Sequence, residues 1–220
     1  MDSEVPPVLP QASPPVPRKS RTWLFVVLGL AGAAMLGFLV VVGTGALFVL
    51  TAKDQPLSAN DKAALLTIED VALWMEDFAP DKSLESFSKK KYLDGSYEID
   101  YVFEDSSDDA APYVMCSIAV EQKTSDALIS YKAVHVGLHI GFGAEEGVEQ
   151  VERNDLFRWG DASKFCLLES EGLPVGVVFS ARKETRVFLV SISGIYFDDS
   201  ETIKELLEEK LRALERLPAP

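Results

Sequence analysis

Residues 23–50 form an unbroken run of 28 residues without a charged side chain. The run consists mainly of Leu, Val, Phe, Ala, Met and Gly, and Thr44 is its one conventional polar residue. At roughly 1.5 Å per helical residue it reaches about 42 Å, which exceeds the ~30 Å hydrocarbon core of a bilayer. A helix in the core of a soluble domain carries a polar stripe, and this run has none. The sequence therefore predicts a single transmembrane helix over residues 23–50.

A cleaved signal peptide is the alternative interpretation of this run. Its apolar stretch is about twice the usual 7–15 residues of a signal-peptide core. In addition, 22 residues precede it, and no small-x-small cleavage site follows it. These features favour an uncleaved signal-anchor.

The charges beside the run predict its orientation. Arg18, Lys19 and Arg21 lie just before it, whereas Lys53 and Asp54 follow it. Because positively charged flanks tend to stay in the cytoplasm, we expect the N-terminus inside and the C-terminal part of the chain outside.

Three further segments complete the expected organisation. Residues 1–22 hold six of the chain's 12 prolines and little apolar bulk, so they predict a disordered Pro-rich cytoplasmic tail. Residues 51–57 are interpreted as a short linker. Residues 58–220 are long enough to form a domain with its own core.

The part of the chain after the run is strongly acidic. The whole chain has a net charge of −14, and residues 1–22 contribute +1 to it, which leaves −15 for the residues after the run. Nucleic acids and anionic lipid surfaces are polyanions, so we expect the acidic domain to bind neither. Cationic ligands or partners fit this charge, although acidity that only keeps the domain soluble explains it more simply.

Patterning predicts an α+β domain. Capping-box pairs at Ser58 and Asp61 and at Thr67 and Asp70 predict helix starts. Strands are expected at 97–103, 114–120, 148–153, 165–169, 175–181 and 186–193, and helices at 68–80 and from Ser200 to near Pro218. The strands cluster between helices, which favours a mostly antiparallel sheet flanked by helices. This order of elements resembles that of PsbP-like domains, in which terminal helices flank a sheet.

Two interpretations fit residues 125–140. Ser125 and Asp126 can cap a short helix that runs through Ile129. Beyond it, apolar residues alternate in the manner of a strand, at Val134, Val136, Leu138 and Ile140. This second stretch is therefore either a third strand or more of the helix.

His135 and His139 are the chain's two histidines. On a continuous helix they share a face and can hold a divalent metal, which gives the alternative function of a membrane-tethered metal-dependent hydrolase. The residues between them include no glutamate, which a zinc protease requires. On a strand their side chains start about 13 Å apart, too far for one ion. Two neutral imidazoles on a polar face are the simpler interpretation.

Cys116 and Cys166 are the only cysteines. Outside the cytoplasm they can pair, and the closed loop would then restrict the unfolded chain by about 4 kcal/mol. Both lie in apolar, strand-like segments, where two free buried thiols fit equally well. The spacing does not match a Cys-x-x-Cys redox or zinc motif.

Other polar features are interpreted as structural. The acidic segment 104–109 suits a solvated hairpin tip, and Trp159, Gly160 and Asp161 suit a corner of the chain. The sequence contains neither a Gly-x-Ser-x-Gly elbow nor a phosphate-binding glycine loop. We therefore expect a binding or scaffold module without a cofactor, in contact with the lipid bilayer and with a protein partner or a second copy.

Small residues recur four apart within the predicted span, at Gly29, Ala33 and Gly37. Small side chains at this interval let two membrane helices approach closely, so the span is expected to self-associate.

We predict that Ala33→Leu lowers this self-association, because the larger side chain separates the two backbones. A membrane two-hybrid assay measures the effect. An unchanged signal would remove Ala33 from the helix-pairing face.

Overall fold

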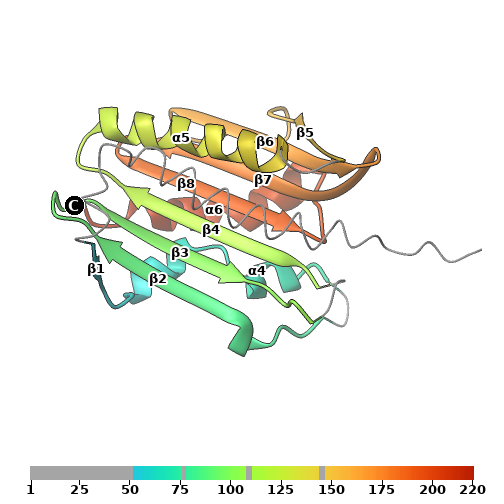
Figure 1. The fold of residues 1–220 in the computed structure, drawn as a ribbon, viewed down its shortest axis with the longest axis horizontal. Helices are drawn as coiled ribbons and strands as arrows, with labels where there is room; N and C mark the ends of the chain where they lie inside the picture. The colour runs from blue at the N-terminus through green and yellow to red at the C-terminus, as the bar shows by residue number, and fades with distance from the viewer. Residues whose placement is uncertain (1–51, 76–77, 108–110, 144–146) are drawn as a thin grey trace, which may run out of the picture.

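The computed structural model describes residues 52–75, 78–107, 111–143 and 147–220. The predicted tail, the predicted span and its Gly29, Ala33 and Gly37 face lie outside these residues. Within them, every helix is too short or too polar to cross a bilayer. They form an α+β fold around one eight-stranded antiparallel sheet (Figure 1).

The strand order across the sheet is β1-β2-β3-β4-β8-β7-β6-β5. The strands are β1 Lys53–Asp54, β2 Glu85–Lys91, β3 Tyr97–Phe103, β4 Tyr113–Val120, β5 Val148–Glu152, β6 Ala162–Ser170, β7 Leu173–Lys183 and β8 Arg186–Ser193. Strands β2 to β4 and β5 to β8 form two meanders, and the sheet is continuous because β4 pairs with β8 at its centre.

Helices cover both faces of the sheet (Figure 1). The helices are α3 Ala59–Ala64, α4 Ile68–Ala72, α5 Thr124–Gly143 and α6 Ser200–Glu215, with a 3-10 turn η2 at Lys82–Leu84. The short helices α3 and α4 share one face with α6, which we call the α6 face. Among the described helices, α5 alone covers the other, which we call the α5 face.

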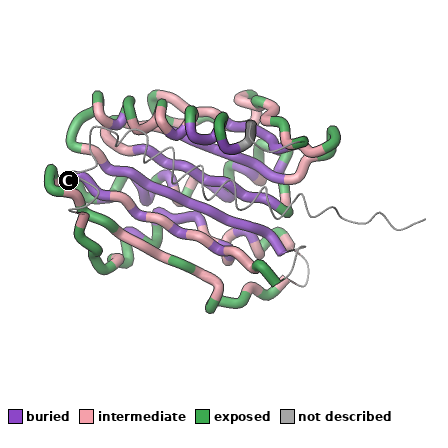
Figure 2. The backbone as a smooth tube through the Cα atoms, in the orientation of Figure 1, coloured by how far each residue is buried: buried purple, intermediate pink, exposed green. Residues whose placement is uncertain are grey.

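Burial is highest at the centre of the sheet (Figure 2). All eight residues of β4 are buried, because helices lie over both of its faces. In β3, buried and half-buried residues alternate, so its side toward the α5 face is less well covered. The α6 face holds the larger core, in which Leu207, Leu211 and Leu214 of α6 pack with sheet residues such as Cys116 and Ile118.

Most of the expected strands are confirmed. Strands β3 and β8 have the expected bounds, and the other four differ from the expected ranges by at most three residues at either end. The turn signals are confirmed as well: Glu171, Gly172 and Glu184 have φ of 56°, 76° and 53°, in the left-handed region that tight turns use. Both predicted capping boxes are present, Ser58 with Asp61 and Thr67 with Asp70.

The strand interpretation of residues 134–140 is wrong, because α5 is one continuous helix through Gly143. Its inward side chains recur at helical spacing, at Ala127, Val134 and Leu138, and all three are buried. Val136 and Ile140 point outward on the same helix. Apolar residues on both sides of a helix therefore produced the apparent alternation.

Two strands were not anticipated. Strand β2 lies in the stretch interpreted as a charged connector, and β1 lies within the predicted linker 51–57. Serine and lysine side chains dominate β2, so the strand lacks an apolar signal; its backbone nevertheless pairs with β3 along its full length. The helix expected over 68–80 ends at Ala72.

A largely buried ion pair between Asp61 and Lys89 links α3 to β2. Asp61 has no exposed surface; its carboxylate accepts the Ser58 backbone N–H at 2.7 Å and the Lys89 ammonium at 2.8 Å. Burial alone raises the pKa of Asp61, but the hydrogen bonds from Lys89 and Ser58 outweigh it and hold this pKa below its usual value. Lys89 also lies 4.8 Å from the centre of the Tyr97 ring.

We predict that Asp61→Ala lowers the free energy of unfolding by about 3–5 kcal/mol, because it leaves the Lys89 ammonium buried without a counter-charge. Ser58→Ala is the control, since it removes only the cap and should cost about 1 kcal/mol. Equilibrium urea unfolding measures both. Equal losses for the two variants would show that the ion pair adds nothing beyond the cap.

Candidate functional site

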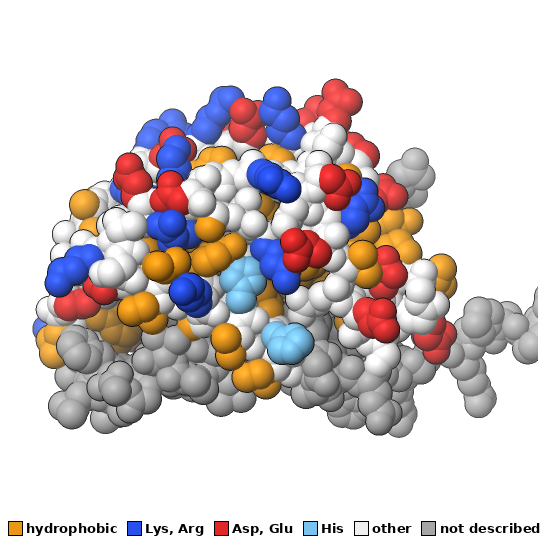
Figure 3. All heavy atoms as spheres, turned by 90° about the horizontal axis from the view of Figure 1, so that it is seen from above, with side chains coloured by type: hydrophobic (Ala, Val, Ile, Leu, Met, Phe, Trp, Pro, Cys, Tyr) orange, Lys and Arg blue, Asp and Glu red, His pale blue; other side chains and the backbone are white. Residues whose placement is uncertain are grey.

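Helix α5 carries both histidines and an unusual outer surface. Its inner side packs on β4, β7 and β8. On its outer side Ile129, Val136 and Ile140 are 54%, 53% and 60% exposed. Figure 3 shows this surface, with the two histidines among exposed apolar side chains. A helix that is apolar all round is usually covered all round, so this outer stripe is the most conspicuous exposed feature of the described residues.

The two histidines lie one turn apart on α5 but have different environments. His135 is half-buried: Nε2 lies 3.2 Å from the Ser180 Oγ, and its ring meets Tyr131 edge-on at 4.5 Å between centres. Burial, with the nearby Lys164 charge, lowers the pKa of His135, which favours the neutral ring at pH 7. His139 is exposed. The pair therefore divides into one packed and one solvated imidazole.

The Ser180 and His135 contact does not form a nucleophile site. Ser180 is only 1% exposed, so a substrate carbonyl has no path to its oxygen. In the described part of the chain, no carboxylate hydrogen-bonds to the other ring nitrogen of His135. The contact instead gives the buried Ser180 hydroxyl of β7 a hydrogen-bond partner on α5.

A metal centre at the two histidines needs further ligands. Across the described residues, no group of three His, Cys, Asp or Glu side chains converges closely enough to hold an ion. Two imidazoles alone leave a zinc site incomplete.

The two cysteines are free and buried. Cys116 lies on the α6 face, where the Leu66 N–H approaches its sulfur at 3.4 Å. Cys166 pairs in register with Val178, whose side chain belongs to the α5 face. The sheet therefore separates the two sulfurs. Of the two arrangements that the sequence left open, this structure has the free thiols.

A half-buried acidic row lies on the α5 face of β3. Glu98 receives a hydrogen bond from the Tyr92 hydroxyl, and Asp100 receives one of 2.7 Å from Ser117. Burial raises the pKa of Glu98 to about 7, despite the Tyr92 hydrogen bond, and the Asp100 and Glu121 charges add to the rise. Burial also raises the pKa of Asp100 and of Glu121. Glu98 is therefore partly protonated at neutral pH.

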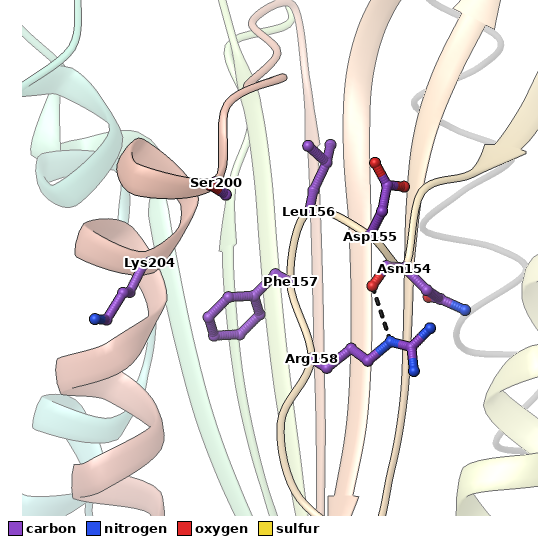
Figure 4. Close-up of a pocket in the computed structure, with 7 residues that line it drawn as sticks. All are labelled: Asn154, Asp155, Leu156, Phe157, Arg158, Ser200 and Lys204. Carbon is purple, nitrogen blue, oxygen red and sulfur yellow. Dashed lines mark hydrogen bonds between the residues drawn. The ribbon is translucent and has the colours of Figure 1, made fainter.

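A shallow hollow of about 540 Å³ lies between the β5–β6 connection and the first turns of α6 (Figure 4). It is open to solvent, and Arg158 turns back to donate to the Asn154 carbonyl at 2.9 Å. Its lining residues are Asn154, Asp155, Leu156, Phe157, Arg158, Ser200 and Lys204. Arg153 forms an ion pair with Asp155, so two of the three charged side chains that line the hollow, Asp155 and Arg158, already have partners.

The Trp159 to Asp161 segment is a structural corner. The Asp161 N–H donates to the Arg182 carbonyl at 2.8 Å, and its carboxylate accepts the Glu184 N–H at 2.8 Å. A Cβ on Gly160 would lie 2.4 Å from the Arg182 carbonyl oxygen, so only glycine fits there. In the acidic loop, Asp105 accepts from Ser107, and Asp108 and Asp109 lie outside the described residues.

The chain matches no known family model, no curated protein and no solved structure. Its function therefore has to be inferred from the fold and the side chains.

Sequence patterns missed two of these features. Glu98 and Asp100 lie in an alternating strand, which places polar residues on the open side and gives no sign that they are half-buried. The outer stripe of α5 was missed because residues 134–140 were left open between a strand and a continuation of the helix. The sequence signal for this stripe is that the helix has more apolar residues than its inner, sheet-facing side can hold.

We predict that Glu98→Gln stabilises the protein at pH 8 by about 1–3 kcal/mol, because the buried carboxylate is charged there and the amide is not. The folded pKa of about 7 lies above the ordinary value of 4.5, so the folded protein gains stability as pH falls from about 7 toward 4.5. The advantage of the variant should therefore shrink at pH 5. Thermal unfolding at both pH values measures it.

Glu149→Gln is the matched control, since Glu149 is exposed on β5. His135 is present in the wild type and in both variants, so its contribution to the pH dependence is common to all three. The difference in stability between the two variants therefore reports the effect of Glu98. An advantage for Glu98→Gln that is the same at pH 8 and pH 5 would contradict the burial of this charge.

Proposed function

We propose that the protein is a single-pass membrane-anchored binding or scaffold module. In this proposal, residues 1–22 lie in the cytoplasm, residues 23–50 span the bilayer, and the acidic α+β domain lies outside the cytoplasm. The apolar run and the basic residues that precede it support the anchoring and the orientation.

The observation that carries the binding role is the outer stripe of α5. Ile129, Val136 and Ile140 together present three aliphatic side chains, each more than half exposed, along one side of a rigid helix. Exposed apolar surface of this kind marks contacts with other proteins. An apolar helix or groove on a neighbouring envelope protein, or the same stripe on a second copy, is the matching partner.

The alternative of a metal-dependent hydrolase has weaker support. His135 is occupied by Ser180 and Tyr131, and the described residues supply no third ligand beside His139. Binding through α5 needs no further residue and is the function we favour.

We predict that a photo-cross-linking amino acid at Val136 in the full-length chain forms a discrete protein adduct in intact cells. The same residue at Leu173 is the control, because Leu173 is 68% exposed but lies at the start of β7 and outside α5. Mass spectrometry of the adduct identifies a partner or a second copy.

Replacing Ile129 and Ile140 by Ser should abolish the adduct without lowering the thermal midpoint, since both side chains are exposed. A folded chain that gives no adduct at Val136, or gives the same adducts at Val136 and Leu173, would contradict a binding role for this helix.

A further inference from the structure

The chain enters the domain at one end of the sheet. Lys53 in β1 lies opposite Lys91 in β2, which lies opposite Tyr97 in β3. The same row continues through Val120 to Arg186 at the start of β8. We call this row and its loops the tether end, and the opposite end of the strands the far end (Figure 1).

The tether end cannot lie far from the bilayer if the chain is anchored as proposed. Only three residues lead from Leu50, the last residue of the predicted span, to Lys53. Fully extended, they reach at most about 11 Å. The headgroup layer is itself about 5–7 Å thick, and helix tilt takes up the excess length of the span. Lys53 is thereby held at or near the headgroups.

The two ends carry different charges. At the far end, segments 81–85, 104–107, 169–172 and 194–201 contain nine acidic residues and one lysine. At the tether end, segments 53–54, 90–96, 121–123, 161–162, 182–186 and 215–220 contain eight basic and six acidic residues. The strong negative charge of the domain is therefore concentrated away from the point where the chain enters.

Several cations at the tether end are available to a ligand. Lys53, Lys91, Lys123 and Arg216 are exposed, and none of them forms an ion pair with another described residue. Beside them, Leu93 is 67% exposed in the β2–β3 turn. Cations around an exposed aliphatic tip suit a membrane interface, where phosphates and acyl chains lie within a few ångströms of each other.

We propose that the tether end docks on the phosphate headgroups of the leaflet from which the chain emerges. Leu93 then lies at headgroup depth, and the acidic far end is turned toward water. This orientation rests on the proposed membrane anchoring and goes beyond it, because a tether alone would let the domain lie on any face.

The structure offers a matched pair of probe sites. Leu93 and Leu173 are 67% and 68% exposed, Leu93 in the β2–β3 turn at one end of the sheet and Leu173 at the start of β7 at the other. Cys116 and Cys166 are buried, so a thiol-reactive fluorophore will label an introduced surface cysteine selectively. Ile140→Cys adds a third site on the outer side of α5.

The experiment uses the full-length chain in nanodiscs that contain phosphatidylglycerol and a headgroup spin-labelled lipid as quencher. The label at Leu93→Cys should be quenched several times more strongly than the label at Leu173→Cys. Equal quenching at the two sites would overturn the proposal. Strongest quenching at Ile140→Cys would also overturn it, because the domain would then lie on α5.

Charge variants test the phosphate contact itself. Lys91→Gln with Lys123→Gln should reduce quenching at position 93, whereas Lys132→Gln with Lys204→Gln, which removes the same charge from two exposed lysines outside the tether end, should not. Equal effects of the two pairs would contradict headgroup docking. A chain that does not co-purify with nanodiscs would instead refute the anchoring, so the two failures are distinguishable.

Discussion

The stability of the fold depends most on the burial of strands β4 and β8, which pair with each other at the centre of the sheet. These two strands join the two meanders, and helices lie over both of their faces. Burial of apolar surface is the main favourable term in folding, and here it is greatest where chain segments far apart in sequence meet. The outer strands contribute less to the core, and β2 is held by backbone pairing and by the contact between Lys89 and Asp61.

The buried Asp61 and the half-buried Glu98 show how differently a carboxylate can be accommodated. Asp61 has a cation and a capping interaction, which offset its desolvation and keep it ionised. Glu98 has mainly the Tyr92 hydroxyl and lies among other acids, so burial dominates. The first carboxylate fixes a helix to the sheet. The second costs stability at neutral pH.

Sequence patterns predicted the elements whose apolar residues face one side. Strand β3 and helix α6 follow this rule, whereas β4 and β8 were also expected closely although both of their faces are buried. Strand β2 was not predicted because its side chains show no apolar pattern. It lies near the edge of the sheet, where backbone pairing with β3 holds the strand in place. Helix α5 was ambiguous because it is apolar on both sides, and no local pattern reveals which side lacks a cover. The net charge is likewise an average over the domain. It does not reveal that the fold gathers acidic residues at the far end and most of the unpaired cations at the tether end.

The placement of the two thiols has a consequence for biogenesis. Cys116 and Cys166 are held apart by the backbone of the sheet, and both are shielded from solvent. Maturation of this domain therefore needs neither an oxidase nor an isomerase. The fold contains no disulfide between its two cysteines, so its stability does not depend on whether the compartment is reducing or oxidising.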